Sequence, residues 1–152
     1  MRVVLQRVSR ASVRVDGTVL GEIGPGLLLL AAAGAKDAPD EPQRLARKIA
    51  GLRVFADDTG KMNRSIDEVG GSVLLISQFT LYADLRRGRR PSWTGSAEPA
   101  VAAERIEAFR QALEAEGLFV ATGRFGAHMA VELVNDGPVT LIIDGAELAS
   151  SS

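Results

Sequence analysis

Two short segments carry the polar side chains best placed to do chemistry. The first is Ser77-Gln78-Phe79-Thr80-Leu81, which continues the apolar, strand-like run that begins at Ser72. Strand ends that lead into loops present reactive groups on a rigid scaffold. The hydroxyls of Ser77 and Thr80, the amide of Gln78 and backbone N–H groups that leave the sheet could together stabilise an oxyanion. The alternative is a strand end whose polar groups merely cap a turn, and composition alone favours it.

The second segment, Asn135-Asp136-Gly137-Pro138-Val139-Thr140, separates two strand-like runs. Asn, Asp, Gly and Pro in series are typical of a turn, and a trans peptide bond before proline is the default. A glycine before proline also lets another backbone or a ligand approach closely. The residue types alone therefore predict a turn.

Other reactive side chains are scarce. The chain has no cysteine and a single histidine, His128, which excludes disulfide scaffolds, thiolate or multi-histidine metal sites and thiol nucleophiles. Nothing in the sequence places His128 beside Thr80, as a nucleophilic triad would require, so we interpret it as a loop histidine. The acidic pairs Asp57-Asp58 and Asp67-Glu68 are typical of turns. We therefore predict no metal and no cofactor.

Charge is balanced overall but locally uneven. The formal net charge is −1, which excludes a general polyanion-binding protein. Four arginines nevertheless fall within a short stretch: Arg86, Arg87, Arg89 and Arg90. The planar guanidinium suits phosphate, so these arginines are candidates for phosphate contacts, with a solvated loop as the alternative.

The elements that must position these groups follow from hydrophobic periodicity in a chain of 152 residues that is 46% hydrophobic. Strands are expected around an Asp16-Gly17 hairpin turn and again at Leu27. We expect a first helix with Asp40 as its N-cap, and a second helix that begins at Ser96 and ends at Gly117. The other expected strands are 72–77, 118–122, 130–135 and 140–144. This pattern predicts one α+β domain over 1–152, with a largely antiparallel curved sheet, two main helices on one face and a disordered tail from about 145 to 152.

Neither a leader segment nor a membrane span is expected. Charges begin at Arg2, which excludes a signal-peptide core, and the longest apolar run, from Leu27 to Ala33, is too short to cross a bilayer. We therefore expect a cytoplasmic protein that does not interact with membranes.

Together these segments resemble the D-aminoacyl-tRNA deacylase family. Its two signatures, SQFTL and NxGPxT, stand here at residues 77–81 and 135–140. Supporting similarity lies at residues 6–13, 60–63, 90–92 and 122–125, so the resemblance extends from residue 1 to about 144 in natural order.

The resemblance implies a homodimeric editing enzyme with the fold of that family. Such enzymes hydrolyse the ester between a D-amino acid and the terminal adenosine of tRNA, and they also clear glycine loaded wrongly on alanine tRNA. By this carry-over, Ser77, Gln78, Phe79 and Thr80 line the pocket for the aminoacyl-adenosine, and the terminal 2′-OH of the tRNA assists the attacking water.

The second signature is implied to be a chiral filter. Gly137-Pro138 would be a cis dipeptide that enters the partner subunit's active site and rejects L-amino acids. Arg7 would orient it by bonding its backbone carbonyls, and Asn135 and Thr140 would complete the substrate-binding set.

Two other functions compete with this one. A protein-based esterase could use Thr80 as its nucleophile, but Lys61 or His128 would have to be brought in as the base. A non-enzymatic RNA-binding module could use the arginines, but the near-neutral charge and the small number of aromatic residues argue against it.

Overall fold

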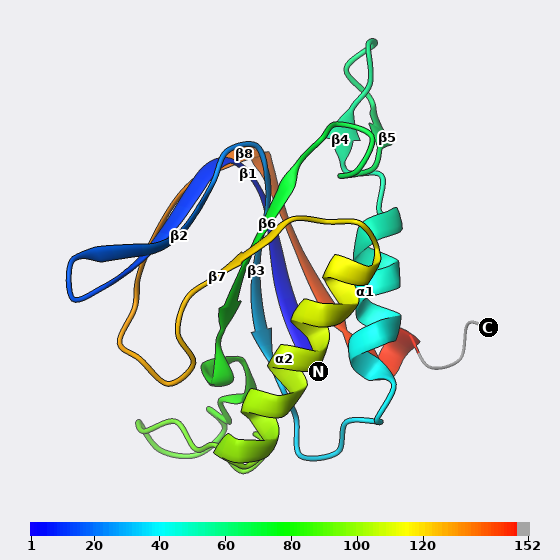
Figure 1. Ribbon diagram of the computed structural model, residues 1–152. Helices are drawn as coiled ribbons and strands as arrows, with labels where there is room; N and C mark the ends of the chain where they lie inside the picture. The colour runs from blue at the N-terminus through cyan, green and yellow to red at the C-terminus, as the bar shows by residue number, and fades with distance from the viewer. Residues whose placement is uncertain (149–152) are drawn as a thin grey trace.

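The computed structural model describes residues 1–148, which form a curved mixed six-stranded sheet covered by two helices on one face, and a separate two-stranded hairpin (Figure 1). The elements in chain order are β1 (Arg2–Val15), β2 (Thr18–Ile23), β3 (Gly26–Ala32), α1 (Glu41–Gly51), β4 (Phe55–Ala56), β5 (Met62–Arg64), β6 (Ser72–Ser77), the 3-10 helix η1 (Phe79–Tyr82), α2 (Pro99–Ala115), β7 (Val120–Thr122), β8 (Ala130–Asp144) and the 3-10 helix η2 (Gly145–Leu148).

The long strand β1 organises the sheet. β8 pairs antiparallel with one edge of β1 along nearly its whole length. The other edge of β1 pairs with β3 in the first half of β1 and with β2 in the second half. The predicted hairpin turn is confirmed: Asp16 and Gly17 join β1 to β2 with φ of 49° and 78°, the pair of positive values that a type I′ turn needs.

The far side of the sheet differs from the expected antiparallel pattern. β6 runs parallel to β3, and β7 runs parallel to β6. This arrangement follows from the two helical connections, because parallel strands need a long crossover and each helix supplies one. The sheet also curls toward a barrel, since Gly21 of β2 lies against β7, where a Cβ would come within 2.8 Å of the Thr122 carbonyl oxygen.

The two faces of the sheet carry separate cores. The helix-covered face buries Leu5, Leu29 and Leu75 against Ile49 of α1 and Phe109 of α2. The concave face buries a smaller cluster that includes Val13, Leu28, Leu74 and Ile76. The predicted α+β class, with both helices on one face, is therefore confirmed.

The helices begin differently from the expectation. Asp40 precedes α1, but its carboxylate pairs with Arg44 at 3.0 Å and caps no backbone N–H. The second helix begins at Pro99, three residues after Ser96, with Glu98 in the N-cap position. Proline favours the first turn of a helix, where its missing N–H is not needed, and this preference places the start at Pro99.

The expected break in the last strand is a bulge within one continuous strand, β8. Between the pairs Gln6–Thr140 and Val8–Asn135, a single residue of β1, Arg7, faces four residues of β8, 136–139. The extra residues arch out of the ladder, as in a large β-bulge, and pairing then resumes. We call residues 136–139 the Gly-Pro bulge.

The start of the chain and the end of β8 pack on α1. The Met1 ammonium donates to Asp37 at 2.6 Å and to the buried carboxylate of Glu41. Residues 145–148, expected to belong to a disordered tail, form η2 instead, because Gly145 is buried there and bonds the Met1 carbonyl at 2.8 Å. The rest of that expected tail, 149–152, lies outside the described residues.

Candidate active site

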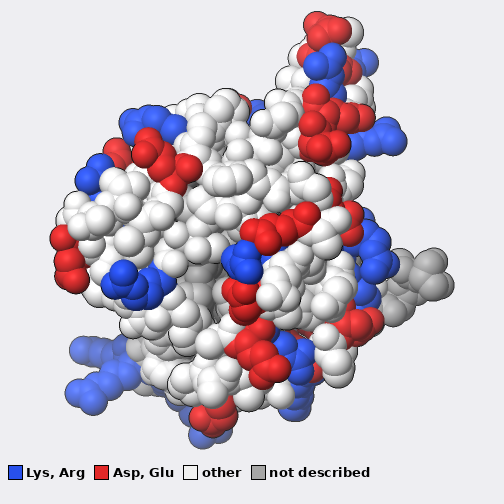
Figure 2. All heavy atoms as spheres, viewed as in Figure 1, with Lys and Arg blue, Asp and Glu red and all other residues white. Residues whose placement is uncertain are grey.

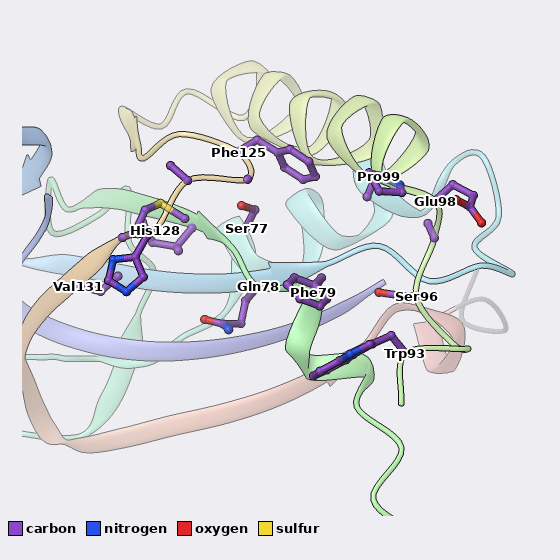
Figure 3. Close-up of a pocket in the computed structure, with 16 residues that line it drawn as sticks. Ser77, Gln78, Phe79, Trp93, Ser96, Glu98, Pro99, Phe125, His128 and Val131 are labelled. Atoms are coloured by element: carbon purple, nitrogen blue, oxygen red, sulfur yellow. The ribbon is translucent and has the colours of Figure 1, made fainter. Parts of the chain in front are cut away.

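A pocket of about 600 Å³ opens at the carboxyl end of β6 (Figure 3). Three segments far apart in the sequence form its walls: the end of β6 with the start of η1, the stretch from Trp93 to the first turn of α2, and the loop 125–129 before β8. The pocket is therefore a tertiary feature, built where a central strand of the sheet stops.

Strand β6 delivers the first signature segment to this pocket. Residues 73–76 are buried, and the strand ends at half-buried Ser77. The Gln78 N–H still bonds the Ala31 carbonyl of β3 at 2.7 Å, after which the chain turns into η1. Ser77, Gln78 and Phe79 all line the pocket.

The backbone N–H groups of Phe79 and Thr80 have no hydrogen-bond acceptor within residues 1–148. The first N–H groups of a helix lack intrahelical partners, which leaves these two free at the start of η1. They differ from the Gln78 N–H, which the sheet uses. Two free donors beside Ser77 make this turn capable of holding an oxyanion.

Thr80 differs from Ser77, Gln78 and Phe79, the three residues that the resemblance placed in the pocket together with it. Its side chain is exposed, it is not part of the pocket wall, and its hydroxyl accepts a hydrogen bond from the Gln78 amide. Lys61, one of the two bases that a Thr80 nucleophile would need, lies in the loop of the β4–β5 hairpin and also lines no part of the pocket.

His128 and two aromatic residues line the pocket, although residue spacing alone did not assign them to it. His128, interpreted from the sequence as a loop histidine, lies in the pocket wall beside Val131. The rings of Phe79 and Trp93 meet edge to face at 5.0 Å, and Phe125 lies across the pocket from Phe79. A mainly apolar cavity with a few polar groups is typical of small-molecule sites.

Arg2 of β1 anchors the 3-10 helix η1 through two contacts. The Arg2 guanidinium lies 4.6 Å from the centre of the Tyr82 ring and donates to the Leu81 carbonyl at 3.2 Å. Burial is the largest effect on the Tyr82 phenol and raises its pKa, so this hydroxyl stays neutral at physiological pH. The anchored helix keeps the end of β6 in a fixed position.

The second signature forms a separate site on β8. The Gly137–Pro138 peptide bond is cis, and both residues are exposed and form no part of the pocket wall of their own chain. A Cβ at Gly137, whose φ is 125°, would come within 2.7 Å of the Arg7 Nη2 atom. The backbone of this dipeptide therefore packs directly on Arg7.

Arg7 holds the Gly-Pro bulge from β1. Its Nε donates to the Asp136 carbonyl at 3.1 Å and its Nη1 to the Val54 carbonyl at 2.6 Å. The bonded carbonyl is thus that of Asp136, one residue before the dipeptide that the resemblance implied. Asn135 donates to the carbonyls of Arg7 and Val139, closing the bulge across its base, and Thr140 accepts from the Gln6 amide at 3.2 Å.

Neither a metal cluster nor a membrane helix is found in the described part of the chain. Residues 1–148 bring together no group of three or more His, Asp or Glu side chains that could hold a metal ion. No helix among them is long and apolar enough to cross a membrane.

Comparisons with known proteins cover nearly the whole chain. The sequence model of a family described as D-Tyr-tRNA(Tyr) deacylase matches residues 4–144. A D-aminoacyl-tRNA deacylase of Deinococcus radiodurans is 57% identical over 144 residues, which are 95% of this chain and 99% of that protein. One of Thermomicrobium roseum is 55% identical over 152 residues, 100% of this chain and 99% of that protein.

Solved structures show the same fold. A structure titled "c-Myc DNA Unwinding Element Binding Protein" has a TM-score of 0.88 and 35% identity, covering 95% of this chain and 98% of its own. A probable eukaryotic D-amino acid tRNA deacylase has a TM-score of 0.77 and 17% identity, covering 93% and 97% respectively, and shows the fold alone.

Proposed function

The chain belongs to the D-Tyr-tRNA(Tyr) deacylase family and hydrolyses D-aminoacyl-tRNA, and from this premise we propose how its two signature segments divide the work. The pocket at the end of β6 holds the aminoacyl-adenosine at the tRNA acceptor end. The Gly-Pro bulge of a second copy of the chain closes that pocket and excludes L-amino acids.

The observation that carries this proposal is the separation of the two segments within one chain. The pocket wall contains Ser77, Gln78 and Phe79 but neither Gly137 nor Pro138. The dipeptide instead lies exposed on β8, held by Arg7 as a rigid projection. A rigid projection that contributes to no pocket of its own subunit is suited to complete the pocket of another subunit.

The surface of β8 supports a homodimer. Among the described residues, β8 pairs with β1 only, so its outer edge is available to a second chain. Val134 and Ile142 on this strand are 42% and 81% exposed, so both are apolar side chains that association with a second chain could bury. Exposed apolar side chains along an unpaired strand edge favour association between identical subunits.

Exclusion explains a broad choice of D-amino acids better than selective binding does. No single pocket binds the side chains of Tyr and Asp equally well and also holds Gly, which has none, whereas a short rigid backbone can occupy the space that any L side chain needs. Glycine has no side chain to reject, so glycine on alanine tRNA passes the same filter.

The reaction requires little side-chain chemistry. An aminoacyl ester is already activated, and the free N–H group of Phe79, a residue of the pocket wall, supplies an oxyanion donor that contributes about 3–4 kcal/mol to transition-state binding. Water, assisted by the terminal 2′-OH of the tRNA, attacks the carbonyl carbon, and the ester bond to the ribose breaks. Thr80 takes no covalent part, because its hydroxyl is engaged by Gln78 and lies outside the pocket wall.

Substrate preference tests the whole proposal. The unmodified protein is expected to release the amino acid from D-Tyr-tRNA and from Gly-tRNA(Ala), and to leave L-Tyr-tRNA and L-Ala-tRNA intact. Release from L- and D-forms at similar rates would support the indiscriminate esterase, and release from neither would support a pure RNA-binding module.

Mixed dimers test whether the filter works in the partner subunit. Gly137→Ala displaces Arg7 from the bulge and is expected to admit L-Tyr-tRNA. Refolding this variant with a tenfold excess of a pocket variant, Phe79→Ala, pairs nearly every intact pocket with an intact bulge, so L-Tyr-tRNA hydrolysis per Gly137→Ala chain should fall by about tenfold. An unchanged rate after mixing would mean that each bulge serves its own chain.

A further inference from the structure

The loop of residues 83–95 between η1 and α2, called here the arginine loop, carries the densest positive charge of the described chain. Arg86, Arg87, Arg89 and Arg90 are all exposed, and Gly88 turns the loop at its tip with φ of 67°. Figure 2 shows blue side chains projecting at the lower left, where Figure 1 places this loop.

Only one of the four guanidinium groups is neutralised. Arg86 binds the Asp84 carboxylate through two nitrogens, at 2.9 and 2.7 Å, and this pairing lowers the pKa of Asp84 to about 2. Arg87, Arg89 and Arg90 form no ion pair with any residue in 1–148. Three unpaired positive charges within four residues repel one another, so the loop gains stability when an anion binds there.

The base of the arginine loop is joined directly to the pocket. Asp84 and Ser92 exchange two backbone hydrogen bonds, at 2.8 and 3.1 Å, which close the loop into a rigid stem. The next residue, Trp93, packs on Phe79 and forms part of the pocket wall. The stem of the arginine loop therefore adjoins the pocket wall at Trp93.

We infer that Arg87, Arg89 and Arg90 bind the phosphates of the single-stranded nucleotides that precede the terminal adenosine of the tRNA. This inference rests on the proposed function, because it takes the occupant of the pocket to be the end of an RNA strand. The strand must leave the pocket across its rim, and its first phosphates come within reach of the loop. Arginine forks pair with phosphate in bidentate geometry, and a local cluster on a near-neutral protein confines that attraction to this end.

The test compares substrates with and without those phosphates. The variant Arg87→Gln/Arg89→Gln/Arg90→Gln is assayed on D-Tyr-tRNA and on D-Tyr-adenosine, which lacks every upstream phosphate. We expect KM for D-Tyr-tRNA to rise by about 10- to 100-fold while kinetics on D-Tyr-adenosine stay unchanged. The slope of log(kcat/KM) for tRNA against log salt should become shallower by about 2, the value for three contacts to a single strand.

A matched control removes the same charge elsewhere. Arg14→Gln/Arg47→Gln/Lys48→Gln takes three exposed cations from the β1–β2 hairpin and α1, and it should leave both substrates unaffected. An unchanged KM and salt slope in the arginine-loop variant would overturn the inference. An equal loss on both substrates would also overturn it, because the loop would then act only through the pocket wall.

Binding of uncharged tRNA separates this inference from the proposed function. Fluorescence anisotropy with deacylated tRNA needs no reaction, and the arginine-loop variant should bind it about 10- to 100-fold more weakly than the unmodified protein. If the unmodified protein hydrolysed no D-aminoacyl ester, the proposed function would fail, and the arginine loop would still be judged by this binding measurement.

Discussion

Replacing Arg7 by alanine is expected to impair the choice between D- and L-substrates far more than it impairs folding. The Arg7 side chain is only 13% exposed, and its guanidinium donates at 3.1 Å to the Asp136 carbonyl and at 2.6 Å to the Val54 carbonyl. Hydrogen bonds from a charged donor contribute about 1.5–3 kcal/mol each. The ion pair with half-exposed Asp136, at 3.3 Å, adds less than about 1 kcal/mol.

The two bonds together contribute about 3–6 kcal/mol: one holds the Gly-Pro bulge through Asp136, and the other anchors the Arg7 guanidinium to Val54. The bulge stands outside the β1–β8 ladder, so losing these bonds mainly makes local opening of the bulge easier and has a smaller effect on the free energy of global unfolding. We expect the rate on L-Tyr-tRNA relative to D-Tyr-tRNA to rise by about 100-fold, while Tm falls by no more than about 5 °C.

Two further variants sharpen the assay. Arg7→Lys keeps the charge but has one donor group in place of the fork, so it should restore only part of the discrimination. Arg10→Ala, on the same strand, removes an exposed arginine whose ion pair with Glu132 spans 3.5 Å, and it should change neither rate ratio nor Tm. A lower Tm in Arg7→Ala with the rate ratio intact would refute the reasoning, because Arg7 would then serve stability alone.

Four other outcomes can be measured directly. Thr80→Ala should lower kcat by less than about tenfold, against about a millionfold for loss of a true nucleophile, and mass spectrometry of the unmodified protein during turnover should find no acyl adduct on Thr80. Trp93→Ala removes the edge-to-face contact with Phe79 and should raise KM for D-Tyr-adenosine by about 2- to 10-fold; an unchanged KM would remove this wall from the binding site. In NMR titration the Asp84 carboxyl should titrate near pH 2, and Arg86→Gln should return the pKa of Asp84 toward its usual value. Because this pKa is lowered in the folded state, the Asp84–Arg86 pair stabilises the fold above the usual carboxyl pKa, and this contribution is lost as pH falls toward 2. Glu41→Gln leaves the buried Met1 ammonium paired with Asp37 alone and should lower the free energy of unfolding by about 3–5 kcal/mol in urea titrations, whereas a change below about 1 kcal/mol would contradict the buried pairing.

The features that could be predicted from the sequence are those decided by neighbours in the chain. The Asp16-Gly17 turn depends on two residues that accept positive φ, and β6 is a continuous apolar run. The exposed polar groups after Ser77 follow from the place where that run stops. In each case, a few consecutive residues contain the whole physical cause.

The features that could not be predicted depend on partners distant in sequence. Trp93 and His128 line one pocket because the segment before α2 and the loop before β8 both lie against the end of β6, and no local sequence pattern predicts that contact. The sequence of the Gly-Pro bulge predicts a turn because its residues are turn formers. In the structure, β8 continues on both sides of the bulge because β1 pairs with the residues before it and after it. The parallel pairing of β6 with β3 likewise depends on helix packing rather than on either strand.

The pairing of β1 with β8 has a consequence for synthesis on the ribosome. Arg2 pairs with Asp144 and Arg14 with Ala130. One edge of β1, the first strand to be synthesised, therefore stays unpaired until β8, the last strand, has been synthesised. β2 and β3 can pair with β1 early, but the other edge of β1 keeps its backbone N–H and C=O groups unpaired until nearly all of the chain has been made. Nascent chains stalled before Ala130 should therefore bind chaperones or self-associate, and release of the final strand should end both.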